Sequence, residues 1–145
     1  MRKYIFLIIS ILWTLVILSF STQSGETSGS ISYNITFYIY NLFHSFLPNL
    51  EIDTLHLIIR KCAHIGEYAV LGIWYGMTGY HFKIKGYFII ILGLVIALID
   101  EGIQLLSIER GPSLIDALLF DFPGFLIGLF IIILLHKKNT KFDVS

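Results

Sequence analysis

The sequence is poor in charged residues and contains a single cysteine. Charged residues occupy 14% of the 145 positions, whereas an ordinary soluble domain has about 25%. The 10 basic residues are balanced by 10 acidic ones, so the surplus of Lys and Arg that a nucleic-acid binder needs is missing. Cys62 alone can form neither an internal disulfide nor a cysteine-based zinc site. Because 56% of the residues are hydrophobic, we expect an integral membrane protein rather than a disordered chain or a water-soluble globule.

Long apolar runs also indicate a membrane protein. Four stretches are long enough to cross a bilayer: 4–20, 56–80, 86–106 and 113–135. Arg2 and Lys3 precede the first stretch as in a signal peptide, but the stretch is longer than an apolar signal core of about 7–15 residues and no A-x-A site follows. We therefore predict an all-α membrane protein that forms one domain over residues 1–145, with four transmembrane helices.

Residues 31–46 carry no charge, and their apolar and aromatic side chains recur at helical spacing. Asn34 and Asn41 lie on another face of the same helix. The polar residues are spread through the segment, so a fifth full span is disfavoured. We predict a short helix that lies in the outer interface or re-enters the membrane.

The basic residues mark one side of the predicted bundle. Most of them flank the apolar stretches at the side of the two termini: Arg2, Lys3, Lys83, Lys85, Lys137, Lys138 and Lys141. The positive-inside rule places this side, with both termini, in the cytoplasm. The outer halves of the last three predicted spans contain ionisable residues, whereas the inner halves contain none. The sequence therefore predicts a polar site that faces outward.

In the stretch 56–80, Arg60, His64 and Glu67 are spaced i, i+4 and i+7, so they share one helix face. Lys61 and Tyr68 lie at the edge of that face. An ionisable residue inside a membrane costs about 2.5–3.5 kcal/mol on insertion scales, so a functional role is the first hypothesis for each one.

The next two predicted helices place polar residues at matching depths. Asp100 and Gln104 share a face, with Glu101 beside them, and Asp116 and Asp121 occupy the first two turns of the last helix. Arg110 lies in the loop between these helices. We expect three helices to combine these groups in one outward-facing pocket.

Acidic residues outnumber basic ones in this pocket, so at least one carboxyl group should be protonated, share a proton with His64 or meet a cation. The candidate acid–base residues are His64, Glu67, Asp100 and Glu101. A divalent cation bound by Glu67, Asp100, Glu101, Asp116 or Asp121 is a further possibility, because oxygen ligands suit Mg²⁺ or Ca²⁺. The alternative is a purely structural cluster, in which Arg60 or Lys61 neutralises Asp100 or Asp116 and holds the helices together.

Two pairs of glycines and one proline predict how the helices pack and where one of them bends. Gly72-x-x-x-Gly76 and Gly124-x-x-x-Gly128 predict helices that approach one another closely. Pro123 predicts a bend in the last helix, with a freed carbonyl near Leu119 and beside Asp121.

The motifs together resemble the VanZ-like family over residues 10–130 or so. The matching elements occur in the order Ser21-x-Gln23-Ser24, Arg60-Lys61-x-x-His64-x-x-Glu67-Tyr68, Asp100-Glu101-x-x-Gln104 and Arg110-x-x-Ser113-x-x-Asp116-x-x-x-x-Asp121. The family often has Asn at the position of Asp121, so this chain places an additional negative charge in the pocket.

The resemblance implies a small protein of the bacterial inner membrane that is associated with resistance to glycopeptide antibiotics, teicoplanin in particular. The candidate substrate-binding residues are Ser21, Gln23, Ser24, Arg60, Lys61, Gln104, Arg110, Asp116 and Asp121. The expected partner is a membrane lipid or a lipid-linked envelope precursor, or the lipoglycopeptide itself, and not a nucleic acid.

Three functions agree with this pocket. The first is an enzyme that acts on a lipid-linked substrate at the outer leaflet. The second is a binding protein without turnover. The third is a transporter or flippase, which would need an oligomer because the uncharged inner halves of the helices offer no polar path across the membrane.

Overall fold

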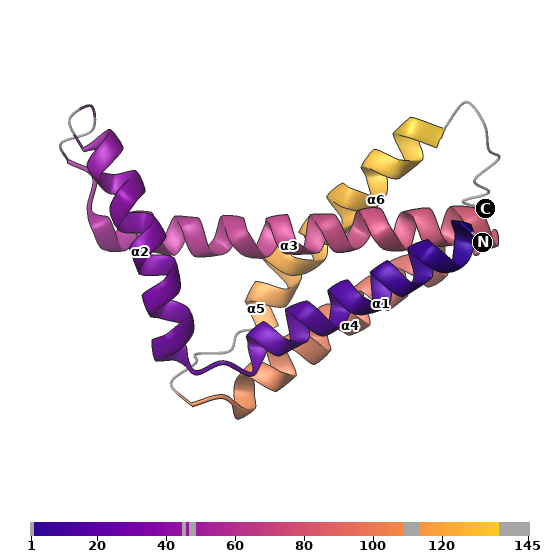
Figure 1. Ribbon diagram of the computed structural model, residues 1–145, viewed down its shortest axis with the longest axis horizontal. Coiled ribbons are helices and arrows are strands. Elements are labelled where there is room, and N and C mark those ends of the chain that lie inside the picture. Colours follow the sequence, from indigo (N-terminus) through magenta and orange to yellow (C-terminus); the bar gives the residue numbers. More distant parts are fainter. Residues whose placement is uncertain (1, 45, 47–48, 109–113, 137–145) are drawn as a thin grey trace.

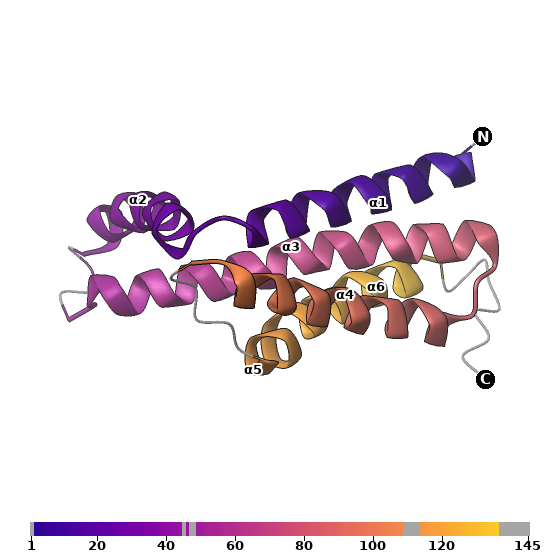
Figure 2. The same cartoon turned by 90° about the horizontal axis from the view of Figure 1, so that it is seen from below.

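The computed structural model describes residues 2–44, 46, 49–108 and 114–136, and these residues form helices and no strand. The helices are α1 (Arg2–Ser21), α2 (Gly25–Phe43), α3 (Ile52–Phe82), α4 (Gly86–Leu106), the short α5 (Leu114–Asp116), the π-helical turn η1 (Ala117–Asp121) and α6 (Phe122–His136). In Figures 1 and 2, α1, α4 and α6 pack against the long helix α3, and α2 crosses one end of α3 steeply.

The helices meet at two ends of the bundle. At one end the Tyr4 and Phe82 rings lie 5.7 Å apart and the Tyr80 and His136 rings 4.4 Å apart; we call this the basic end, because Lys3, Lys83 and Lys85 belong to it. At the other end the Ser107 hydroxyl donates to the carbonyl of Ser21 at 2.8 Å, which joins α4 to α1. This second end carries the cavity described below, and we call it the cavity end.

Three helical stretches are long and apolar enough to cross a membrane: Lys3–Ser21, Gly86–Leu106 and Leu114–His136. The prediction of four such helices is wrong for residues 56–80. That stretch belongs to α3, which has 31 residues but contains ionisable side chains and several glycines, which lower its hydropathy. Because α1, α4 and α6 pack around α3, much of its surface faces protein and need not be apolar.

Hydrogen bonds between side chains join α1 to α3. The hydroxyls of Ser10 and Thr78 lie 3.0 Å apart, and those of Thr14 and Tyr75 lie 3.1 Å apart. Such bonds between small polar side chains are typical of helix pairs in membranes, where lipid offers no competing partner.

The glycine motifs join α3 to α6. A Cβ atom at Gly72 would collide with the carbonyl of Phe125, and one at Gly128 with the carbonyl of Ala69. The backbones of the two helices therefore touch directly, which confirms the predicted close packing. Phe125, which is fully buried, also packs against Gly93 of α4.

A π-helical turn directly precedes Pro123 in the last helix, where the sequence predicted a bend. The N–H of Phe122 donates to the carbonyl of Ala117, five residues earlier. A proline has no N–H to donate and its ring collides with the preceding turn, so the chain before it widens. Asp121 is the last residue of this wide turn.

Helix α2 begins earlier than the predicted segment 31–46. Ser24 caps its first turn, because its hydroxyl oxygen accepts the N–H of Thr27 at 3.2 Å. The side chain of Thr36 is the one buried in this helix, whereas large apolar side chains such as Tyr38 and Leu42 are 78% and 68% exposed. This pattern suits a helix at a membrane surface. The interfacial position of α2 remains a prediction.

Candidate functional site

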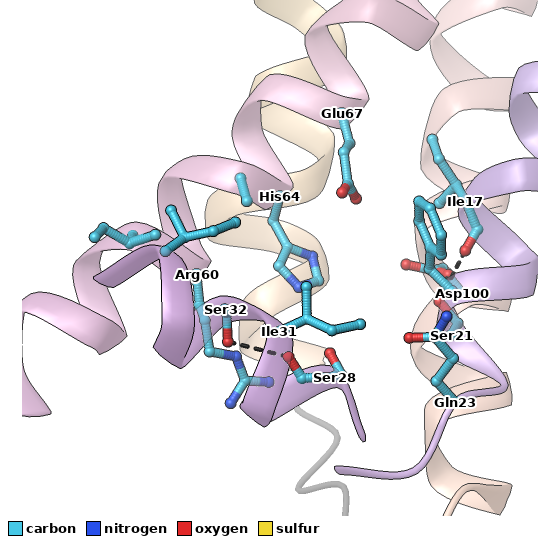
Figure 3. A pocket seen from close by; sticks show the side chains of 14 residues that line it. Ile17, Ser21, Gln23, Ser28, Ile31, Ser32, Arg60, His64, Glu67 and Asp100 are labelled. Carbon is cyan, nitrogen blue, oxygen red and sulfur yellow. Dashed lines mark hydrogen bonds between the residues drawn. The ribbon is translucent and has the colours of Figure 1, made fainter. Parts of the chain in front are cut away.

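A cavity of about 230 Å³ lies at the cavity end, between α1, α2, α3 and α4 (Figure 3). Its apolar lining consists of Ile17, Phe20, Ile31, Ile35, Ile59 and Ala63, and its polar lining of Ser21, Gln23, Ser28, Ser32, Arg60, His64, Glu67 and Asp100. The cavity therefore joins a hydrocarbon-like wall to a strongly polar one.

Helix α3 contributes the polar face that the sequence predicted. Arg60, His64 and Glu67 all line the cavity (Figure 3), because residues at i, i+4 and i+7 project from one side of a helix. Arg60 extends toward Ser28 and Ser32 of α2, so the guanidinium lies at the junction of α2 and α3 (Figure 3).

Asp100 projects from α4 on the opposite side of the cavity (Figure 3). Its side chain is 1% exposed. The Ser21 hydroxyl donates a hydrogen bond to Oδ1, and the Gln104 amide donates to Oδ2 at 3.4 Å. The end of α1 and the next turn of α4 thus hold this carboxylate in place, and they bring together three of the predicted site residues.

Asp121 and His64 form a hydrogen bond that joins η1 to α3. The distance between Asp121 Oδ1 and His64 Nδ1 is 2.9 Å, and Asp121 is completely buried. A carboxylate accepts hydrogen bonds only, so Nδ1 is the donor and Nε2 of the neutral ring carries the lone pair. Within the described part of the chain, Asp121 Oδ2 has no hydrogen-bond partner.

Tyr68 belongs to this polar group, although the sequence analysis assigned it no role. It is completely buried next to Asp100 and Asp121. Its hydroxyl makes no hydrogen bond of normal geometry to any residue that the structure describes. Its position directly after Glu67 in the motif was the signal that could have indicated a role. An aromatic residue in a membrane helix, however, most often serves only to pack against its neighbours.

Other predicted site residues lie apart from the cavity. Lys61 forms an ion pair with Asp116, and both side chains are about a quarter exposed. This pair fits the structural alternative, in which a basic residue neutralises a carboxylate between helices. Glu101 is buried, 2% exposed, and does not line the cavity. Ser24 serves as the cap of α2.

Two residues of the motifs, Arg110 and Ser113, lie outside the described residues. Of the predicted site, the structure therefore brings Ser21, Gln23, Arg60, His64, Glu67 and Asp100 to one cavity, with Gln104 and Asp121 directly behind it.

One group of side chains has the donor atoms and spacing of a metal site. A ring nitrogen of His64 and carboxylate oxygens of Asp100 and Asp121 all lie within 4.8 Å of one another. The sequence analysis considered the carboxylates of Glu67, Asp100, Glu101, Asp116 and Asp121 as ligands. Asp100 and Asp121 belong to both sets, whereas His64 was not among the expected ligands and Asp116 pairs with Lys61.

A family model described as VanZ/LLP1 matches residues 6–136. The chain belongs to the VanZ/LLP1 family. This result confirms the resemblance to the VanZ-like family that the motifs indicated. No curated protein matches this VanZ/LLP1 chain, and no solved structure matches it either. The matched region contains the whole cavity, so the site lies in the part of the molecule that defines the family.

Proposed function

We propose that this VanZ/LLP1 protein acts at the outer face of the bacterial inner membrane on the headgroup of a lipid-linked envelope substrate. Glycopeptide resistance, to teicoplanin in particular, would be the physiological result. The observation that carries the proposal is the cavity, which has an apolar wall from α1 and α2 and a polar wall from α3 and α4.

Such a cavity suits an amphipathic ligand. The planar guanidinium of Arg60 is well adapted to a phosphate or carboxylate group. Ile31 and Ile35 of α2 line the same cavity and offer contact to an acyl or isoprenyl chain. Because other apolar residues of α2 are exposed, a lipid chain could pass from the cavity to the bilayer along this helix.

The polar wall has the parts of an acid–base catalyst. Asp121 holds the ring of His64 through Nδ1, which leaves Nε2 to accept or return a proton. Glu67 and Asp100 line the same cavity. The proposed reaction class is proton transfer that assists attack on, or departure from, the bound headgroup.

The charge distribution favours this orientation. Lys3, Lys83 and Lys85 lie at the basic end, which the positive-inside rule assigns to the cytoplasm, so the cavity end faces outward. In this arrangement α3 passes through the membrane inside the shell of the three apolar helices. Ionisable residues are tolerated there because they face the interior of the bundle.

A binding function without turnover is the second candidate. The Ser21 hydroxyl is occupied as a donor to Asp100, and Cys62 is exposed outside the cavity lining. Neither of these two groups is placed as a nucleophile, which suits a protein that captures a headgroup or a lipoglycopeptide.

Teicoplanin and vancomycin susceptibility of a sensitive host that expresses the chain tests the proposal. We expect the wild type to protect the host, and Arg60→Ala, His64→Ala and Asp100→Asn to reduce protection at normal membrane abundance. If the protein is an enzyme, a conservative substitution that removes a proton-transfer group should lower its rate about 100-fold or more. If it only binds, the same substitution should reduce its affinity gradually.

Matched controls are His44→Ala and Asp53→Asn, because both side chains are exposed and neither lines the cavity. They should protect like the wild type. A wild type that protects no better than an empty vector would refute the resistance role. Full protection by all three cavity variants would refute the cavity as the site.

A further inference from the structure

We infer that His64, Asp100 and Asp121 form a binding site for a single divalent transition-metal ion, with Zn²⁺ as the preferred metal. The three residues come from α3, α4 and η1, helices that are far apart in the sequence. Their donor atoms lie within 4.8 Å of one another. The inference does not depend on which substrate occupies the cavity.

The separations are compatible with coordination. Zn²⁺ binds nitrogen and oxygen at about 2.0–2.2 Å, so ligand atoms around one ion are about 3–4 Å apart. Movement of the side-chain donor atoms by about 1 Å would reduce separations of up to 4.8 Å to these values. His64 and Asp121 are already at 2.9 Å, and binding would replace the proton between them with the ion.

The charge balance calls for a cation at this place. Asp100 and Asp121 are 1% and 0% exposed, and burying an uncompensated carboxylate is costly. In the part of the chain that the structure describes, no Lys or Arg forms an ion pair with either of them. Two carboxylates and one divalent cation would together be neutral.

A second observation points to a missing ligand. Asp121 is fully buried, yet its Oδ2 has no hydrogen-bond partner among the described residues. The hydroxyl of Tyr68 lies beside the same carboxylates and makes no hydrogen bond of normal geometry to a described residue. A buried polar atom in a bilayer normally finds a partner, and an ion with its bound water would supply partners for both.

The surrounding hydrogen bonds resemble those that orient metal ligands. Asp100 accepts from Ser21 and from Gln104, and ligating carboxylates are usually held by such outer bonds. The cluster is anchored on helices, so its geometry is not left to a loop.

The donor set selects the metal. An imidazole suits Zn²⁺ and its neighbours in the transition series, whereas Ca²⁺ takes 6–8 oxygen ligands. Three protein ligands with an open fourth position are typical of a catalytic zinc site. His64 and Asp100 also line the cavity, so that open position would face the bound ligand.

The test uses the full chain, purified in detergent, stripped with EDTA and dialysed against Zn²⁺, with bound zinc measured by inductively coupled plasma mass spectrometry. We expect about one zinc per chain for the wild type, as in other three-ligand sites. Asp121→Asn, Asp100→Asn and His64→Gln should each weaken binding by at least about 10-fold, the smallest loss usual for support of a metal site.

Asp116→Asn is the matched control, because Asp116 is a carboxylate on a neighbouring turn that pairs with Lys61 and lies outside the cluster. It should bind zinc like the wild type. The inference would be overturned if the wild type bound no stoichiometric zinc, or if Asp116→Asn and Asp121→Asn lost zinc binding equally. Protons would then balance the charge of the two carboxylates.

A measurement on the wild type alone avoids any effect of substitution on folding. With Mn²⁺ as a paramagnetic substitute, pulsed electron paramagnetic resonance should show coupling to the nitrogen of one imidazole. Bound Mn²⁺ without nitrogen coupling would overturn the assignment of His64. Metal binding is measured without a substrate, so its failure is separate from failure of the proposed function.

Discussion

Single residues decide where polar groups are compensated in this bundle. Arg60 and Lys61 are adjacent in the sequence, yet Arg60 lines the cavity and Lys61 pairs with Asp116. Adjacent residues on a helix point in directions about 100° apart, so the sequence pattern identified the polar face but could not assign each base to its acid. Asp121 was predicted to lie in the pocket region, and its contact with His64 was not predicted.

Ser21 provides a test at this scale. Ser21→Ala removes the hydroxyl that donates to the buried Asp100. We expect a loss of about 1 kcal/mol in the free energy of unfolding, between the average of about 0.6 for hydrogen bonds within membranes and the 1.5–3 of bonds to charged groups. Reversible unfolding in mixed micelles measures the change.

The control for this measurement is Ser30→Ala, since Ser30 is exposed on α2 and bonds only to a carbonyl of its own helix. Equal effects of the two substitutions would show that the Ser21–Asp100 bond contributes no particular stability.

Among the elements, α3 and α6 depend on each other most closely. Glycines of both helices remove the side chains that would keep the backbones apart. The Gly-x-x-x-Gly spacing revealed this property from the sequence, because it places both glycines on one face. The partner helix could not be read from the spacing, since α1 and α4 were equally available.

Gly128→Ala tests this packing. The added methyl group would collide with the carbonyl of Ala69, and backbone cannot move as easily as a flexible side chain. We expect a loss of about 1–3 kcal/mol, the usual cost of overpacking. The same unfolding measurement in mixed micelles reports it.

Gly102→Ala is the matched control within a helix. No atom lies within 4 Å of a Cβ atom at Gly102, so alanine should be neutral or should stabilise α4 by up to about 1 kcal/mol through its higher helix propensity. A neutral Gly128→Ala would contradict the close contact between α3 and α6.

At the scale of the whole molecule, the two ends of α3 report whether this helix crosses the membrane. Glu51 precedes α3 at the cavity end, and Lys85 follows it at the basic end. If α3 crosses the membrane with the three apolar helices, these two positions are on opposite sides. If α3 does not cross, they are on the same side.

Cysteine labelling distinguishes the two arrangements. In a Cys62→Ser background, an impermeant maleimide applied to intact spheroplasts should label Glu51→Cys, because the basic end is expected in the cytoplasm. Lys85→Cys should react only after the membrane is permeabilised. Labelling of both positions from outside would refute the proposed passage of α3, and labelling of Lys85→Cys alone would reverse the orientation.

The sequence by itself determined the membrane class, the positions of the helices and the polar face of α3, because apolar runs and helical periodicity are local properties of the chain. It overestimated the number of helices apolar enough to face lipid, since hydropathy says nothing about which helix the others enclose. Only the tertiary structure decided that α3 is central, that Lys61 pairs with Asp116, and that His64, Asp100 and Asp121 meet. These contacts join residues of different helices that are not neighbours in the sequence. Their geometry depends on how each helix is rotated about its axis, and that rotation is determined by the glycine contacts, the Pro123 turn and the interhelical hydrogen bonds acting together.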